Sequence, residues 1–293
     1  MIIKAGMIGI SSGNGHPYSW SAIVNGYDEI EIKKCRFKVI PNYLMLYKNT
    51  PLNKNIIISH IWTQNFKESD KIAKASNIPY IAKNLKDLVR EVDCIIFARD
   101  DRSFLKKFSK QLISSKKPIF IDKPIATNKV ELKKILSIQV YNDQIFSSSF
   151  SRFCKETQLT SLEKKKIGIL KKIKCIGPKN SKKYLIHLVD PIIFNFCSKD
   201  EIRSIKKNVN NKTKKISVTW KTGLKTNFIL TGKLNTKFSF EYIGSKSSQI
   251  KIINDPYLGF KKSLIYFFKN MYKGTFHKQH NNHYNIVSIL NEL

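Results

Sequence analysis

The sequence predicts an α/β protein in which a Rossmann-like, doubly wound parallel sheet is followed by an α+β domain with an open antiparallel sheet. In the first half of the chain, short continuous apolar runs alternate with segments of helical periodicity, as expected for strands buried on both faces. In the second half, apolar and polar residues alternate, which is typical of a sheet with one solvated face. The length of 293 residues is enough for two domains.

The parallel sheet is predicted from four apolar runs of strand length, at residues 6–10, 56–62, 94–98 and 118–122. Amphipathic stretches lie between them, and strand–helix–strand alternation at this spacing indicates βαβ units. About thirty residues, 26–55, separate the first helix from the second strand, where a handful is usual. Because residues 39–47 are largely apolar, we expect a small folded insertion there rather than an open loop.

The antiparallel sheet is predicted from three alternating runs, at residues 216–220, 238–242 and 250–252. Glycine-containing turn signals at residues 222–223, 231–232 and 244–245 separate these runs. The change of pattern places the domain boundary after residue 124. We therefore predict a Rossmann-like domain at 1–124, with its insertion at about 26–55, and an α+β domain at 125–293.

Composition limits the class of protein. There are 53 Lys+Arg against 21 Asp+Glu, a formal charge of +32, while 42% of residues are hydrophobic, which excludes a disordered chain. Only six of the basic residues are Arg, and the lysines are spread along the whole chain. Proteins that bind phosphates and bases favour the planar guanidinium of Arg, so the pattern argues against a nucleic-acid-binding protein. The positive field would still attract small anionic substrates.

The cysteines and the longest apolar runs bear on location. Five cysteines, odd in number and without a CxxC pair, indicate reduced thiols in a cytoplasmic protein. No apolar run approaches the roughly 18 residues that span a bilayer, so we predict no membrane span. The first residues lack the basic start and the apolar stretch of a signal peptide.

A loop of small residues follows the first predicted strand. Residues 9–16 read Gly-Ile-Ser-Ser-Gly-Asn-Gly-His, an incomplete version of the GxGxxG turn that brings a dinucleotide close to a helix N-terminus. The second strand ends in Thr, Gln and Asn, without the acid that favours NAD, so the cofactor is predicted as NAD or NADP. The predicted cofactor-binding residues are Gly9, Ser11, Ser12, Gly13, Asn14, Thr63, Gln64, Arg99 and Lys123.

The triplet Asp122-Lys123-Pro124 directly follows the predicted strand at 118–122. Ligands of open α/β sheets bind at the carboxyl ends of the strands. A lysine at this edge can exchange a proton with a substrate hydroxyl while a hydride moves to or from a nicotinamide. Lys123 is therefore the predicted catalytic residue, although such a triplet also occurs in simple turns.

These blocks occur in the order found in the glucose-fructose oxidoreductase/inositol dehydrogenase (Gfo/Idh/MocA) family, which the chain resembles over nearly its whole length. The resemblance rests on residues 9–16, residues 63–65 with the helix that leads to 77–79, the Asp-Lys-Pro triplet, and residues 187–190. It implies a Rossmann domain, an open-sheet domain, NAD or NADP, and reversible oxidation of a sugar or cyclitol hydroxyl.

The resemblance also assigns roles by matched position. Lys123 corresponds to the catalytic lysine and His187 to the histidine of the second domain, which would bind or polarise the reacting hydroxyl, so both are predicted as catalytic residues. Arg152 falls where the family often has an Arg near the substrate, and Lys183 stands where a carboxylate is usual. Lys123, Arg152, Lys183 and His187 are therefore the predicted substrate-binding residues. The second domain is expected to form homo-oligomers through its open sheet, whose apolar face would otherwise be exposed.

Two alternatives stay open. The incomplete glycine motif and Lys183 would suit a member of the same fold that binds a dinucleotide without turnover or has a regulatory role. The charge would suit a basic nucleic-acid-binding protein. A metal is not predicted: His277, His280 and His283 are spaced by three, which turns each ligand about 60° from the last on a helix.

Overall fold

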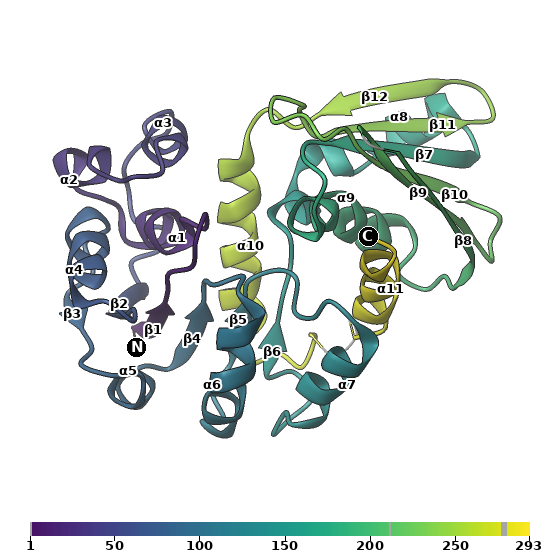
Figure 1. Ribbon diagram of the computed structural model, residues 1–293. Helices are drawn as coiled ribbons and strands as arrows, with labels where there is room; N and C mark the ends of the chain where they lie inside the picture. The colour runs from purple at the N-terminus through teal and green to yellow at the C-terminus, as the bar shows by residue number, and fades with distance from the viewer. Residues whose placement is uncertain (1, 211, 277–279) are drawn as a thin grey trace. The chain divides into compact units, whose positions relative to one another are not determined.

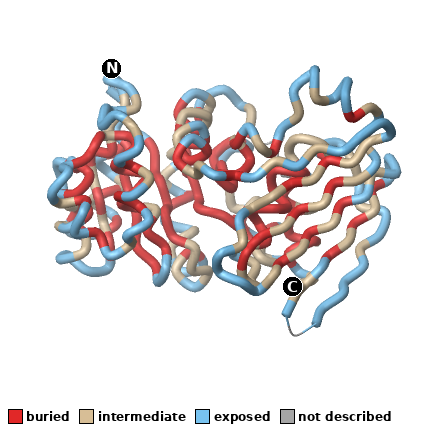
Figure 2. Tube along the Cα trace, turned by 90° about the horizontal axis from the view of Figure 1, so that it is seen from above, coloured by how far each residue is buried: buried red, intermediate tan, exposed pale blue. Residues whose placement is uncertain are grey.

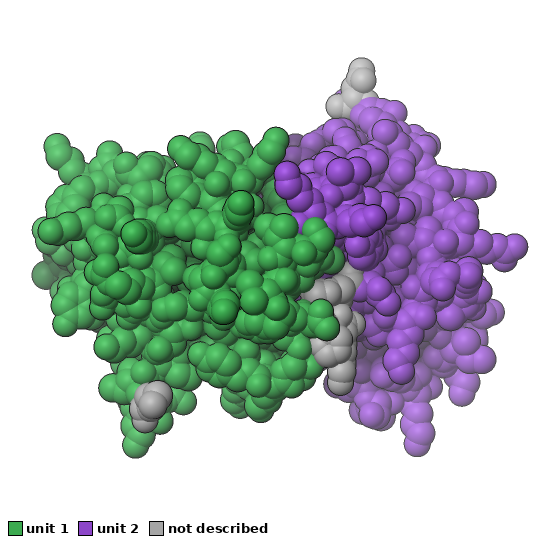
Figure 3. All heavy atoms as spheres, turned by 90° about the horizontal axis from the view of Figure 1, so that it is seen from below, with its two compact units in different colours: residues 1–122, 135–147, 260–277 green, residues 123–134, 148–259, 278–293 purple. Residues whose placement is uncertain are grey.

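The computed structural model describes residues 2–210, 212–276 and 280–293. It divides into two compact units, each assembled from three segments: residues 1–122, 135–147 and 260–277, and residues 123–134, 148–259 and 278–293 (Figure 3). The elements of the chain, in order (Figure 1), are β1 (Ile3–Ile8), α1 (His16–Asn25), α2 (Glu29–Lys33), α3 (Val39–Leu44), β2 (Ile56–Trp62), α4 (Phe66–Ala75), β3 (Tyr80–Ile81), α5 (Leu85–Glu91), β4 (Cys94–Phe97), α6 (Arg102–Ser114), β5 (Ile119–Ile121), α7 (Lys129–Ser137), β6 (Ile145–Phe146), the 3₁₀ turns η1 (Phe150–Phe153) and η2 (Lys155–Thr157), α8 (Ser161–Ile167), β7 (Leu170–Gly177), α9 (Lys182–Phe196), β8 (Ile202–Val209), β9 (Lys214–Trp220), β10 (Lys225–Leu230), β11 (Ser239–Gly244), β12 (Ser248–Ile252), α10 (Pro256–Asn270) and α11 (His280–Asn291).

The first unit contains a parallel sheet in the order β3-β2-β1-β4-β5-β6. Every neighbouring pair in it is parallel. This is the doubly wound order of dinucleotide-binding domains, and it confirms the fold predicted for this part of the chain. The strand order reverses between β1 and β4, so ligands are expected outside the carboxyl ends of these two strands.

Aromatic side chains join the helices to both faces of this sheet. On one face, the Phe120 ring of β5 lies 4.8 Å from that of Trp20 in α1 and 5.5 Å from that of Phe267 in α10. On the other face, Phe104 of α6 lies about 6 Å from Phe97 and Trp62, with centroid distances of 5.9 and 6.0 Å. β4 and β5 are fully buried, as their continuous apolar runs predicted, whereas β2 is buried only at Ile58, Ser59 and Ile61.

The segment 26–55 is the folded insertion that the sequence predicted. Its helices α2 and α3 bury Ile32, Ile40 and Leu44 against the rest of the first unit. The side chain of Asn49 closes the segment, since it donates to the carbonyl of Tyr27 at 2.7 Å and accepts from the Tyr27 N–H at 3.0 Å. The insertion is therefore a fixed part of the unit beside α1.

The second unit is built on a mixed sheet in the order β12-β11-β7-β10-β9-β8. Its pairs are antiparallel except for β7 with β10, which are parallel. One face is covered by α9 and by buried side chains that alternate along the strands (Figure 2); these include Ile173, Cys175, Val218, Trp220, Phe228 and Tyr242. The alternation predicted this face correctly, but it carries no information on strand direction, so the parallel pair was not predicted.

The opposite face of this sheet carries both lysines and isoleucines. The strand registers place five lysines and one acid on it: Lys172, Lys174, Lys206, Lys215, Lys225 and Glu241. The expectation of an apolar face is met in part: Ile250 and Ile252 are exposed, and Ile176, Ile229 and Ile243 are half-buried. The charged residues named above contribute +4 to the formal charge of +32.

Two general findings complete the description. Within the described ranges, no helix is both long and apolar enough to pass through a lipid bilayer. The five cysteines are all buried and unbridged.

A capping box in the second unit makes a test of its stability possible. Thr160 caps α8, and Glu163 accepts from the Thr160 N–H at 2.7 Å, from Gln249 at 2.9 Å and from Lys251 at 2.8 Å. Burial raises the pKa of the Glu163 carboxyl, but these hydrogen bonds outweigh burial and lower the pKa to about 2. The folded-state pKa lies below the ordinary 4.5, so this carboxylate stabilises the fold above about pH 4.5, and the stabilisation is lost as pH falls towards 2.

We therefore expect Glu163→Gln to lower the thermal unfolding midpoint at pH 7, and the difference from the unaltered protein to shrink steadily between pH 4.5 and 2. Differential scanning calorimetry across this range would measure it. Glu201→Gln, which removes an exposed partner of Lys221, is the matched control and should change little. An equal loss for Glu163→Gln at pH 7 and pH 2.5 would contradict the assignment.

Candidate active site

The loop between β1 and α1 is shaped by its glycines. A Cβ on Gly9 would lie 2.3 Å from the Cγ of Pro17, so no larger residue fits where β1 passes into the loop. Gly13 has a φ of +74°, a conformation that other residues rarely adopt. The loop then closes through a short bridge between Ser11 and Asn14. Ser12 and Gly13 form its exposed tip.

The first turn of α1 has few donors to offer an anion. The N–H of His16 donates to the Asn14 side chain at 2.9 Å, Pro17 has no N–H, and the N–H of Tyr18 donates to the Gly15 carbonyl at 3.0 Å. A phosphate at this edge would therefore be received by the tip of the loop rather than by the helix terminus.

Asp122 connects this loop to the end of β5. Its Oδ2 accepts a hydrogen bond from Asn14 Nδ2 at 2.7 Å and lies 2.7 Å from His16 Nδ1. The Asp122 side chain is fully buried, and the His16 ring stacks on Trp20 with 4.6 Å between centroids. The sequence analysis identified Asn14 as a cofactor-binding residue, whereas the structure shows it holding the loop to Asp122.

Arg99 connects the ends of β2 and β4. Its Nε and Nη2 donate to the two carboxylate oxygens of Asp101 at 2.8 and 2.6 Å, and its Nη1 donates to Gln64 Oε1 at 2.6 Å. Gln64 in turn donates to the Ile10 carbonyl at 3.0 Å. The guanidinium carbon stands 3.7 Å from the centre of the Phe104 ring, and Arg99 is only 5% exposed. The structure thus brings together two predicted cofactor-binding residues, Arg99 and Gln64, and they form a hydrogen bond with each other.

Two acidic residues at this edge were missed by the sequence analysis. Asp100 accepts from the Ser11 hydroxyl at 2.7 Å, and Asp101 pairs with Arg99. The available signal was the sequence Ala-Arg-Asp-Asp at residues 98–101, directly after β4. Asp100 therefore places a negative charge against the glycine loop.

Thr63 forms the turn from β2 into α4. Its hydroxyl donates to the Asn65 carbonyl at 2.6 Å, its N–H donates to Ser69 Oγ at 3.0 Å, and Asn65 caps α4. Thr63 is 4% exposed, so its local role is to hold this turn.

A groove runs beside the glycine loop. It has a volume of about 650 Å³ and is lined by Ile10, Ser11, Ser12, Gly13, Arg36, Phe37, Gln64, Asn65 and Glu68. Arg36 and Phe37 come from the insertion and were not among the predicted site residues. The small loop residues, the polar end of β2 and the cationic rim fit the adenosine half of a dinucleotide.

Lys123 follows Asp122 directly and is joined to Pro124 by a cis peptide bond. The side chain is 7% exposed, so it is largely enclosed by protein. In the chain, Lys123 directly follows the aspartate that contacts Asn14 and His16.

The predicted substrate residues of the second unit lie on η1 and α9. His187 Nδ1 is 2.7 Å from Ser149 Oγ, and Ser151 Oγ donates to the His187 carbonyl at 2.8 Å. Arg152, 1% exposed, donates through Nε to Asp190 Oδ2 at 3.0 Å in a buried ion pair. The structure therefore uses Arg152 to hold η1 against α9. Lys183 lies near the start of α9 and is exposed.

The described residues contain no group of three His, Cys, Asp or Glu side chains able to hold a metal ion. Of the histidine series, His277 lies outside the described residues, and His283 is buried in α11.

A sheet of this order with a glycine-containing loop after its first strand is the architecture of dinucleotide-binding proteins. The sequence matches the model of the GFO_IDH_MocA family, described as an oxidoreductase family with an NAD-binding Rossmann fold, over residues 40–150. The match covers the chain from α3 to the start of η1 and confirms the resemblance inferred from the motifs. Comparison with curated protein sequences finds no match.

Solved structures share the fold of the whole chain. The myo-inositol 2-dehydrogenase from Lactobacillus plantarum has a TM-score of 0.70 at 12% identity, covering 99% of this chain and 95% of that one. The apo scyllo-inositol dehydrogenase from Lactobacillus casei has a TM-score of 0.70 at 12% identity, with 100% and 96% covered. GenD2 from gentamicin A biosynthesis, in complex with NAD, has a TM-score of 0.72 at 7% identity, with 99% and 93% covered. At these identities the likeness concerns the fold.

The Asp122 cluster leads to a stability prediction. Asp122→Ala leaves the Asn14 amide without its buried acceptor and is expected to cost about 2–4 kcal/mol of unfolding free energy. Asp122→Asn keeps an oxygen acceptor and should lose less. Urea denaturation would measure both, with Asp70→Ala, which removes an exposed i,i+4 partner of Lys74, as control. If Asp122→Ala costs no more than the control, Asp122 does not hold the loop.

Proposed function

We propose that this protein is an NAD(P)-dependent oxidoreductase that transfers a hydride between a nicotinamide and a hydroxyl or keto carbon of a sugar or cyclitol. The observation that carries the proposal is the Asp122 cluster, which holds the glycine loop at the carboxyl end of β5, and Lys123 directly follows Asp122 in the chain. The family match over residues 40–150 supports the dinucleotide. The inositol dehydrogenases among the structural neighbours support the substrate class.

In this proposal the loop tip binds the dinucleotide and Lys123 exchanges a proton with the substrate. Ser12 and Gly13, exposed at the loop tip, would donate hydrogen bonds to the diphosphate of the dinucleotide. When bound, the nicotinamide supplies the carbon that gains or gives the hydride. In oxidation, the C–H hydride of the substrate would leave for that carbon while the hydroxyl proton passes to Lys123 Nζ.

His187 would orient the substrate. Its ring is fixed by the hydrogen bond between Nδ1 and Ser149, and it packs against Phe150 and Phe238 at centroid distances of 4.9 and 5.4 Å. Fixed in this way, the imidazole would meet the reacting hydroxyl with little loss of conformational entropy. The basic surface of the chain favours a phosphorylated or nucleotide-linked sugar.

A member of the same fold that binds a dinucleotide without turnover is the second candidate. Asp100, bonded to Ser11 at 2.7 Å, opposes the charge of a diphosphate at the loop, and Lys183 replaces the carboxylate expected on α9. This candidate differs from the first in one measurable property, since it predicts binding without any dependence of turnover on Lys123.

We expect NADH or NADPH to raise the thermal unfolding midpoint of the protein. Lys123→Met should keep this shift but lose sugar- or cyclitol-dependent oxidation and reduction by a factor of about 10² or more. Lys129→Met, an exposed lysine at the start of α7, is the control and should keep both binding and turnover. Turnover that survives in Lys123→Met would remove the proposed mechanism. Binding by the unaltered protein with no turnover on any sugar or cyclitol would favour the second candidate.

We also propose that the chain forms a homo-oligomer through the outer face of the second sheet. Its lysines would repel one another across the interface, so association should strengthen as salt rises from about 0.05 to 0.5 M and screens them. Analytical ultracentrifugation would measure this, and Lys215→Ser should shift association at low salt towards that seen at high salt. A monomer at every salt concentration would overturn the proposal.

A further inference from the structure

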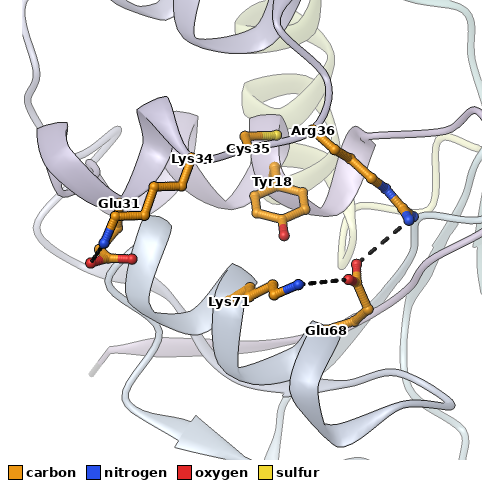
Figure 4. A pocket seen from close by; sticks show the side chains of 7 residues that line it. All are labelled: Tyr18, Glu31, Lys34, Cys35, Arg36, Glu68 and Lys71. Atoms are coloured by element: carbon orange, nitrogen blue, oxygen red, sulfur yellow. Dashed lines mark hydrogen bonds and ion pairs between the residues drawn. The ribbon is translucent and has the colours of Figure 1, made fainter.

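The groove beside the glycine loop has a charged rim that the insertion provides. Arg36, between α2 and α3, lines this groove and also a second cavity of about 140 Å³, in company with Glu68. Tyr18, Glu31, Lys34, Cys35 and Lys71 complete the lining of the second cavity (Figure 4). The insertion thus reaches the part of the fold where the adenosine ribose of a dinucleotide would lie.

The guanidinium of Arg36 is held at this rim but is loosely bound. It lies 5.0 Å from the centre of the Phe37 ring and 3.8 Å from Glu68 Oε2, a separation longer than a hydrogen bond. Its side chain is 56% exposed. Arg36 therefore has donors that an incoming anion could use without breaking a hydrogen bond to Glu68.

Glu68 is balanced by more than one cation. Figure 4 shows Arg36 and Lys71 directed towards it from two sides, with Lys71 Nζ at 3.6 Å. Its Oε2 is buried and accepts no hydrogen bond from the described residues. Burial and the nearby Glu68 raise the pKa of the Tyr18 phenol, so Tyr18 stays neutral and adds no charge to the cluster. Two cations against one acid leave this rim with a net positive charge.

We propose that Arg36 receives the 2′-phosphate of NADP(H) and that the protein therefore prefers NADP(H) to NAD(H). The inference rests on the proposed cofactor binding. The end of β2 carries Thr63, Gln64 and Asn65, none of which is the acid that would accept the ribose hydroxyls and repel a phosphate. A guanidinium can bind two phosphate oxygens at once, and the N-terminus of α4, ten residues long, faces the same groove through Asn65 and Glu68.

Glu68 works against a preference for NADP(H), because its carboxylate could instead accept a hydrogen bond from a ribose hydroxyl and favour NAD(H). Its charge is already offset by Lys71, so transfer of Arg36 from Glu68 to a phosphate would leave a neutral pair behind. Removal of the Glu68 charge separates the two possibilities. If the groove binds a 2′-phosphate, removal strengthens NADP(H) binding. If Glu68 accepts a hydrogen bond from a ribose hydroxyl, removal weakens NAD(H) binding.

Calorimetric titration of the full chain with NADPH, NADH and adenosine 2′,5′-bisphosphate would test the proposal. We expect tighter binding of NADPH than of NADH, a loss of about tenfold or more for NADPH and for the bisphosphate in Arg36→Leu, and NADH affinity unchanged within about twofold. Glu68→Gln should bind NADPH at least as tightly as the unaltered protein. Arg90→Leu is the control for lost charge, because Arg90 is a similarly exposed, acid-paired arginine whose helix leads into the amino end of β4.

The outcomes separate this inference from the function on which it rests. Tighter binding of NADH, or equal losses for both dinucleotides in Arg36→Leu, would overturn the assignment of Arg36 and leave the oxidoreductase intact. Weaker NADH binding in Glu68→Gln would identify Glu68 as the ribose ligand. Failure of all three probes to bind the unaltered protein would overturn the cofactor proposal together with this inference.

Discussion

The buried carboxylate of Asp122 is the interaction on which the carboxyl edge of the first sheet depends. A carboxylate removed from water is costly unless hydrogen-bond donors replace its hydration, and here Asn14 and His16 surround its Oδ2 at 2.7 Å each. Asn14 belongs to the loop after β1 and His16 begins α1, whereas Asp122 directly follows β5. Their contacts hold the glycine loop against the carboxyl end of β5, directly before Lys123. The rest of the proposed chemistry uses this fixed frame.

A second ion pair organises the other side of the same edge. Arg99 donates through Nε and Nη2 to Asp101 and through Nη1 to Gln64, and it stacks on Phe104. Because Gln64 also donates to the Ile10 carbonyl, Arg99 fixes the positions of these two groups at the edge of the sheet. Arg99, Asp100 and Asp101 together carry a formal charge of −1, in a chain whose formal charge is +32. Total charge is thus a poor guide to the electrostatics of the site.

The second unit repeats this use of buried polar pairs. The ion pair between Arg152 and Asp190 holds η1 to α9, and Asp190 also accepts from the Ser149 N–H at 2.8 Å. Ser149 then fixes the ring of His187. The orientation of the His187 ring therefore depends on Asp190, a carboxylate three residues away on the same helix, to which the sequence analysis assigned no role.

The sequence by itself determined the two sheets and the insertion, and it predicts the candidate site at the carboxyl edge of the first sheet. Continuous and alternating apolar patterns predict buried strands, and residues that directly follow parallel strands must meet at one edge of the sheet. The tertiary structure decided which of those residues contact each other. Asn14 and Arg99 are predicted as ligands from their places in the chain, yet Asn14 contacts Asp122 after β5 and Arg99 contacts Asp101 and Gln64. Arg36 was invisible as a site residue because its approach to the groove depends on how an irregular insertion packs against α1 and α4, which no local periodicity encodes.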